Sequence, residues 1–172
     1  MQKASNPQGR WRRNVGFFLA TLLIIASDQL SKLWVRSNLA LGQSLPETGF
    51  FRLTRVHNTG AAFGLFRGQS FPLTIVALVG VAALLAYGLF IYRRFPYLDN
   101  MLGRSALGLI LGGTVGNLID RLYFGYVTDF IDIGIWPAFN VADSAIVVGV
   151  IIFVYSLLPL ARGVKHRDGQ GI

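Results

Sequence analysis

The chain has 172 residues, enough for one domain, and 53% of them are hydrophobic while only 14% are charged. Soluble domains carry about 25% charged residues, so this composition excludes a surface that faces water throughout. The absence of cysteine excludes disulfides, thiol nucleophiles and cysteine-ligated metals. The net charge of +8 comes mostly from residues between apolar segments, a pattern that argues for the orientation of membrane helices and against nucleic-acid binding.

The first predicted membrane span covers about residues 14–35 and continues through Asp28 and Lys32. These two residues are four apart, so they share a helix face and can neutralise each other. A functional role stays equally open, because ionisable groups at membrane depth usually mark function. The start of the chain also resembles a signal peptide that ends near Ser27. We expect no cleavage there, because the apolar stripe continues without a helix breaker.

The following segment, residues 36–70, is predicted to lie outside the cytoplasm. The alternation from Phe50 to Val56 favours a strand, and Asn58-Thr59-Gly60 is typical of a turn. We therefore expect a small β-sheet on the outer membrane surface. The apolar stretch 61–66 is predicted to form a short helix in the interface.

Three further spans are predicted, over about residues 71–92, 105–122 and 141–161. The third span carries Gly108, Gly112 and Gly116 at intervals of four, which predicts a smooth helix face that another helix approaches closely. The expected fold is thus an all-α membrane protein, a single domain of four transmembrane helices with a small extracytoplasmic sheet.

Basic residues set the expected orientation, because lysine and arginine concentrate on the cytoplasmic side of membrane proteins. They are most frequent in both terminal tails and between the second and third spans, so both termini are predicted to be cytoplasmic. Six of the eight acidic residues then fall on or near the outer side: Asp28, Glu47, Asp120, Asp129, Asp132 and Asp143.

Several kinds of catalytic site can be set aside. The two histidines, His57 and His166, lie far apart in the predicted topology, and the HExxH zinc motif and glycine-rich phosphate loops are absent. A Ser-His-Asp triad would have to use His57, and no serine near it occupies a strained elbow. A Ser-Lys pair would need Lys32, which Asp28 already engages on the same helix face. We therefore expect neither a metal nor a cofactor.

Carboxylates remain, and four of them gather at the outer ends of the third and fourth spans: Asp120, Asp129, Asp132 and Asp143. Two carboxylates in one low-dielectric site cannot both ionise, so one keeps a proton. The charged one can deprotonate a water while the other hydrogen-bonds a substrate carbonyl. Spacing alone leaves a structural role open for each, since Asn140 and Asp143 also suit a helix start.

Five motifs in order resemble the lipoprotein signal peptidase (signal peptidase II) family. They run from the first span to the mouth of the fourth and are specific as a set: Asp28-Gln29-Leu30-Ser31-Lys32, His57-Asn58-Thr59-Gly60-Ala61-Ala62-Phe63-Gly64, Gly112-Gly113-Thr114-Val115-Gly116-Asn117-Leu118-Ile119-Asp120-Arg121, Val127-Thr128-Asp129-Phe130 and Phe139-Asn140-Val141-Ala142-Asp143-Ser144.

The resemblance implies an aspartic endopeptidase that removes signal peptides from bacterial prolipoproteins, before a cysteine that carries diacylglycerol. It implies Asp129 and Asp143 as the catalytic residues. It further implies contacts to the substrate, and to the peptide antibiotic globomycin, from Asn58, Asn117, Arg121 and Asn140. The matching Asp28, Lys32 and Asp120 are expected to be structural or supporting.

The same resemblance implies a multi-pass protein of the bacterial inner membrane whose site lies near the outer leaflet. The expected partners are the lipid-modified prolipoprotein and membrane lipid, with no nucleic acid, and one chain suffices for the site. The alternative is a non-enzymatic carrier in which Asp28, Asp120 and Arg121 relay protons or ions. A carrier usually shows an internal repeat or broken helices, and the sequence has neither. The Gly-x-Gly-Asp signature of presenilin-type proteases is missing too.

Overall fold

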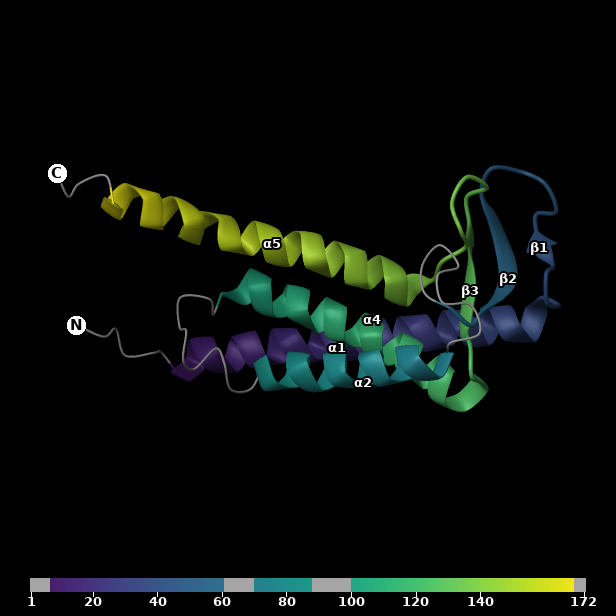
Figure 1. Ribbon diagram of the computed structural model, residues 1–172, viewed down its shortest axis with the longest axis horizontal. Coiled ribbons are helices and arrows are strands. Elements are labelled where there is room, and N and C mark those ends of the chain that lie inside the picture. The colour runs from purple at the N-terminus through teal and green to yellow at the C-terminus, as the bar shows by residue number, and fades with distance from the viewer. Residues whose placement is uncertain (1–6, 61–69, 88–99, 169–172) are drawn as a thin grey trace.

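Four helices run alongside one another and three strands lie across one end of them in the part of the chain that the structure, a computed structural model, describes: residues 7–60, 70–87 and 100–168 (Figure 1). The start of the first helix and the end of the last lie at the opposite end from the strands. In chain order the elements are α1 (Pro7–Asn38), β1 (Ser44–Leu45), β2 (Arg52–Asn58), α2 (Ser70–Ala86), α4 (Met101–Phe124), β3 (Val127–Asp132) and α5 (Val141–Asp168).

Three of these helices contain a segment long and apolar enough to cross a membrane: Trp11–Asn38, Met101–Phe124 and Val141–Leu158. They correspond to the predicted first, third and fourth spans, and α1 continues unbroken through the ionisable positions near its outer end. Helix α2 is apolar but has 17 described residues. Most of the rest of the predicted second span falls within residues 88–99, outside the described part, so this second span stays a prediction.

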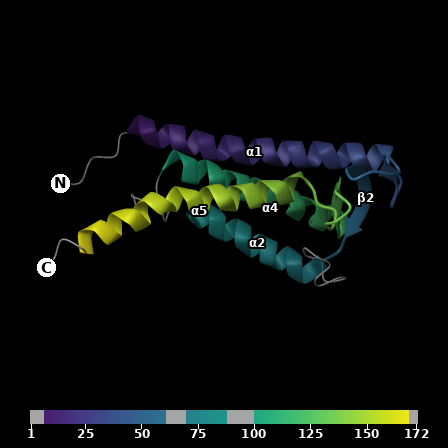
Figure 2. The ribbon, with the colours of Figure 1, turned by 90° about the horizontal axis from the view of Figure 1, so that it is seen from above.

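Helix α4 is central and contacts α1, α2 and α5 (Figure 2). The spacing of its glycines explains the close approach to α1. A Cβ built on Gly112 would lie 2.8 Å from the Thr21 carbonyl oxygen and 2.8 Å from Ile24 Cβ. The helix begins at the N-cap Asn100 and ends at Gly125, whose φ of 75° is left-handed. The predicted smooth helix face is therefore confirmed, and α1 packs on it.

The strands form an antiparallel sheet in the order β1-β2-β3. Strand β2 confirms the predicted strand, shifted by two residues toward the C-terminus. Arg55 ties this strand to α1, because its Nη1 donates to the carbonyl oxygens of Arg36 and Leu39 at 3.0 Å each. The predicted interfacial helix at 61–66 lies outside the described residues.

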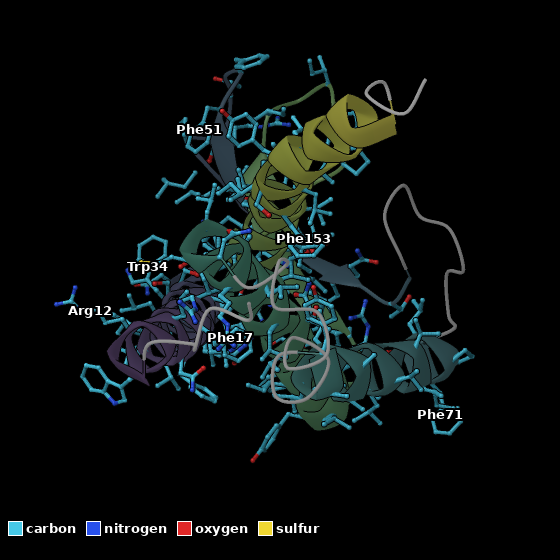
Figure 3. All side chains as sticks on the ribbon, turned by 90° about the vertical axis from the view of Figure 1, so that its left-hand side faces the viewer. Arg12, Phe17, Trp34, Phe51, Phe71 and Phe153 are labelled. Atoms are coloured by element: carbon cyan, nitrogen blue, oxygen red, sulfur yellow. The ribbon has the colours of Figure 1, made fainter. Side chains whose placement is uncertain are left out.

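Two apolar clusters hold the elements together. Phe17, Leu107 and Leu111 pack between α1 and α4, whereas Val35, Leu39 and Phe130 join the end of α1 to β3. Figure 3, seen along the helices from the end away from the sheet, shows Phe17 inside the bundle and Phe71 pointing outward from α2. The second cluster fixes β3, and with it Asp129, over the end of α1.

Close packing at Gly112 predicts that Gly112→Ala destabilises the protein although alanine is the better helix former. The added methyl group must push α1 away, at a cost of about 1–3 kcal/mol. Thermal unfolding in detergent should show a lower midpoint. The matched control is Gly80→Ala in α2, where a Cβ would meet no atom within 4 Å, so its midpoint should hold or rise. A Gly112→Ala midpoint equal to that of the unaltered protein would contradict this packing.

Candidate active site

The sheet and two helices bring the predicted site residues together at the sheet end of the bundle. Asn58 ends β2 and Asp129 lies on β3, where Val56 is its partner across the sheet. Asn117 lies in the last third of α4, and Asn140 immediately precedes α5. These residues are far apart in the sequence, and the antiparallel pairing of β2 with β3 is what carries the first two to the helices.

Asp129 is almost completely buried in this site, with 2% of its surface exposed. Its two oxygens accept hydrogen bonds from Asn58 Nδ2 at 2.9 Å and Asn140 Nδ2 at 2.7 Å. Burial, and then the negative charge of Asp143, raise the pKa of Asp129 to about 7, although both amide donors oppose the shift. This carboxyl can therefore keep a proton near neutral pH.

Asp143 lies in the first turn of α5 and belongs to a reciprocal cap. Its backbone N–H donates to Asn140 Oδ1 at 2.9 Å, while its own Oδ2 accepts from the Asn140 backbone N–H at 3.2 Å. Its other oxygen accepts from Asn117 Nδ2 at 2.8 Å. The two roles that the sequence left open, helix start and site residue, are thus compatible in one side chain.

Asn140 joins the two aspartates directly. Its side-chain nitrogen donates to Asp129 and, at 3.2 Å, to Asn117 Oδ1. Its side-chain oxygen accepts the backbone N–H of Asp143, and its own backbone N–H donates to Asp143 Oδ2. The residue is fully buried. Because every polar group of this side chain is engaged, the relative position of the two carboxyl groups is fixed by one residue.

A buried ion cluster lies beneath the two aspartates. Lys32 Nζ is 2.8 Å from Asp28 Oδ2 and 3.4 Å from Asp120 Oδ2, and all three side chains are inaccessible to solvent. Asp28 Oδ1 accepts the backbone N–H of Ala142 at 3.1 Å, and Asp120 Oδ2 accepts that of Thr128 at 2.8 Å. Each of these carboxylates therefore holds the backbone of the residue that precedes Asp143 or Asp129. Their role as supporting residues stays a prediction.

Asp132 and Arg121, two neighbouring residues, have partners outside the pair of aspartates. Asp132 does not join the site, because it pairs with Arg52 at 2.7 Å and accepts from Thr54 at 3.0 Å at the far end of β3. None of the ion pairs between described residues includes Arg121. It donates to the Gly60 carbonyl oxygen at 3.4 Å, and Arg36 pairs with Asp120 instead, at 3.3 Å.

Sequence reasoning missed two members of the buried ion cluster, which we call the supporting cluster. They are Arg36 and Gln29. Arg36 Nη1 also donates to Thr128 Oγ1 at 3.1 Å, and Gln29 Nε2 bridges Asp28 and the Gly116 carbonyl oxygen at 3.1 and 3.0 Å. The spacing of Lys32 and Arg36, four residues apart on one helix face, was the signal available for the first. Among the described residues no group of three or more histidine, aspartate or glutamate side chains could hold a metal ion.

The raised pKa of Asp129 predicts a stability that falls as pH rises. Between about pH 4 and 7 the folded protein keeps a proton that the unfolded chain has released. Each pKa unit corresponds to about 1.4 kcal/mol. We expect Asp129→Asn to remove this dependence, so its unfolding midpoint should rise relative to the unaltered protein across that interval.

The matched control is Asp132→Asn on the same strand. The Gly134 backbone N–H, together with Thr54 and Arg52, lowers the pKa of Asp132. Its contribution to stability is therefore complete above the unfolded value of 3.8 and is lost only below it. The difference between this variant and the unaltered protein should stay flat over the interval. A flat difference for Asp129→Asn as well would contradict the raised pKa.

Comparison with known proteins gives consistent results. The profile of the signal peptidase (SPase) II family matches residues 20–159. The lipoprotein signal peptidase of Dehalococcoides mccartyi strain CBDB1 is 53% identical over 140 residues, which cover 81% of this chain and 86% of that protein. The lipoprotein signal peptidase of Moorella thermoacetica is 51% identical over 153 residues, covering 88% and 98% respectively.

Solved structures agree with this relationship. A bacterial membrane enzyme determined by the in meso method at 2.3 Å has a TM-score of 0.72 and 30% identity, over 83% of this chain and 87% of the other. A second bacterial membrane enzyme, determined by the same method at 1.9 Å, has a TM-score of 0.69 and 30% identity over 83% and 92%. The family profile spans most of the chain, from within α1 into α5. The chain therefore belongs to the signal peptidase II family.

Proposed function

We propose that this protein removes the signal peptides of lipid-modified prolipoproteins, and that Asp129 and Asp143 perform the hydrolysis. The observation that carries the proposal is the contact of Asn140 with both carboxyl groups, which keeps them together in a buried place. Names of relatives provide the substrate class, since proteins up to 53% identical are lipoprotein signal peptidases.

The proposed reaction needs one charged and one protonated carboxyl group. The charged carboxylate takes a proton from a water, whose oxygen adds to the carbon of the scissile carbonyl. The protonated carboxyl donates its proton to the carbonyl oxygen, which gives a neutral tetrahedral intermediate. Collapse of this intermediate breaks the carbon–nitrogen bond, and the proton taken from water passes to the leaving amine. One hydroxyl proton of the intermediate returns to the carboxyl that had donated its own, so both groups regain their starting states. No metal and no covalent enzyme intermediate is required.

Substrate contacts are proposed for the polar residues around Asp129 and Asp143, which we call the dyad. Asn58 and Asn117 each bind one of the aspartates, so they support the pair and border the place where a peptide would lie. Arg121, held near Gly60 on the turn after β2, offers a guanidinium that no ion pair between described residues uses. We propose that these residues and Asn140 orient the peptide backbone, and that globomycin competes at the same place.

The site lies at the end of the helices, which suits a substrate held in the membrane. A diacylglyceryl cysteine and an apolar signal helix keep the scissile bond near the bilayer surface, and burial of the acyl chains between helices would provide most of the affinity. The catalytic groups can then act mainly on the transition state. We propose that one chain suffices for the site.

A bacterial inner-membrane topology with four spans is part of the proposal, with α2 extended as the remaining span. The sheet would then face outward and the site would lie near the outer leaflet. The common position of both helical ends away from the sheet supports this arrangement (Figure 1), as does the basic character of both tails.

We predict that Asp129→Asn and Asp143→Asn each lower cleavage of a diacylglyceryl precursor by at least about 1000-fold, because each role in the dyad is lost outright. The measurement is single-turnover cleavage by purified protein in lipid. Asp132→Asn is the matched control, since that residue pairs with Arg52 outside the site, and it should cleave normally. The unlipidated precursor should be cut poorly by all forms. Normal cleavage by either dyad variant would disprove the mechanism.

The topology predicts that a tag at either end is shielded in sealed cells. Positive residues in both tails oppose their transfer across the membrane. A membrane-impermeant reagent should therefore label neither tag until the cells are opened, whereas a cysteine introduced at Glu47, in the segment between β1 and β2, should react in intact cells. Labelling of an intact C-terminal tag from outside would overturn the orientation.

A further inference from the structure

Lys32 makes a contact that its ion pairs do not account for. Its Nζ donates to Asn117 Oδ1 at 2.9 Å, in addition to the two carboxylates of the supporting cluster. An ammonium group has three donors, and here three acceptors meet it on a fully buried side chain. One of the three acceptors belongs to a residue that touches the dyad, so the lysine reaches the site through a single amide.

This contact fixes the direction of the Asn117 amide, together with the longer hydrogen bond that Asn140 Nδ2 donates to the same oxygen at 3.2 Å. The two ends of an asparagine amide differ, because the oxygen only accepts and the nitrogen only donates. An ammonium group faces the oxygen, which turns Nδ2 toward Asp143 Oδ1 at 2.8 Å. The reversed amide would set two donors against each other at Lys32 and two acceptors against each other at a charged Asp143.

The fixed amide favours the charged form of the Asp143 carboxyl. Both of its oxygens accept donors, one from Asn117 Nδ2 and one from the Asn140 backbone N–H at the start of α5. A helix start also favours negative charge. Asp129 has amide donors as well, but it lies on a strand and is almost completely buried, whereas Asp143 is half-buried.

We infer that Lys32 is a positioning residue which, by holding the Asn117 amide, keeps Asp143 as the charged carboxylate and leaves the shared proton on Asp129. The inference rests on the proposed function and divides the two roles in it. Asp143 takes the proton from the attacking water, and Asp129 donates to the scissile carbonyl. The raised pKa of Asp129 agrees with this division.

Other charges around Asp143 do not produce the same effect. Arg121 on α4 lies within electrostatic range of Asp143, Asp129 and Asp120, but its hydrogen bond goes to Gly60. Asp120 on α4 and Asp28 on α1 are engaged by Lys32 and by backbone N–H groups. Among these groups, only Lys32 has a hydrogen bond that leads through one side chain to an oxygen of Asp143.

The experiment compares Lys32→Met, Asn117→Ala and the double variant with the unaltered protein on a diacylglyceryl peptide substrate. Rates are measured between about pH 4 and 8. We expect Lys32→Met to lower kcat by roughly 10- to 100-fold with KM within about twofold, as for a misplaced catalytic group. The acidic limb of the kcat profile should move to higher pH, because the charged form of Asp143 loses its fixed donor. In the Asn117→Ala background the lysine change should alter kcat by less than about twofold.

Thr21→Val is the control for a merely structural role. Thr21 is buried on the same helix and bonds to the Gly108 carbonyl oxygen of α4 at 3.2 Å, away from the dyad. It should lower the unfolding midpoint without moving the acidic limb. If Lys32→Met does not fold, Lys32→Met/Asp28→Asn replaces it, because removing one charge of each sign avoids a buried unpaired carboxylate.

Two results would overturn the inference. One is an acidic limb that stays in place in the lysine variant, and the other is an effect on kcat that adds fully to that of Asn117→Ala. Either result leaves the proposed function standing as long as Asp129→Asn and Asp143→Asn remain inactive. Normal cleavage by those two variants would instead remove the proposed function, whatever the lysine variants do.

Discussion

An ammonium group at the depth of apolar helices is stable only where acceptors surround it, and this requirement governs the arrangement around Lys32. Asp28 and Asp120 satisfy two of its donors. The other oxygen of Asp28 accepts the backbone N–H of Ala142. The Asp120 oxygen that faces Lys32 also accepts the backbone N–H of Thr128, and the other Asp120 oxygen pairs with Arg36. The charge of Lys32 thus helps to position the start of α5 and the crossing of β3 over the helices. Asp143 and Asp129 follow directly after Ala142 and Thr128 in the sequence.

The supporting cluster depends in turn on the absence of a side chain at Gly116. A Cβ on Gly116 would lie 2.6 Å from Asp28 Oδ2, so any other residue there would displace the carboxylate from Lys32. The glycine that lets α1 and α4 approach is therefore also the one that makes room for the ion pair. Packing and charge neutralisation are in this sense one constraint, and neither helix could be moved outward without leaving buried charges unpaired.

Local patterns were enough to predict the elements that depend on hydropathy and short-range spacing. The helices α1, α4 and α5 and the glycine face of α4 appear where the sequence placed them, and the strand β2 lies two residues further along the chain. The convergence of Asp129 and Asp143 was also predicted, from topology and from the resemblance to a family.

The sequence could not predict which of several chemically similar residues or segments would pair with each other. Strand β3 pairs with a segment some seventy residues earlier in the chain, and such long-range pairing leaves little local trace. Asp132 and Asp129 are alike in sequence, yet the register of the strand sends one to Arg52 and the other to Asn140. Similarly, Arg36 and Arg121 both lie near Asp120, and only the three-dimensional packing decides that Arg36 takes it.

Asn140 has two structural roles, and this has a consequence for inhibition. Its side chain caps α5 and binds Asp129 with the same few atoms. A compound that hydrogen-bonds to this residue would be hard to escape by mutation, since a replacement that weakens the compound also weakens the helix start and loosens the dyad. Drug pressure on this part of the enzyme would therefore select for changes elsewhere, such as in uptake or in the abundance of the protein, before it selects for changes in the site.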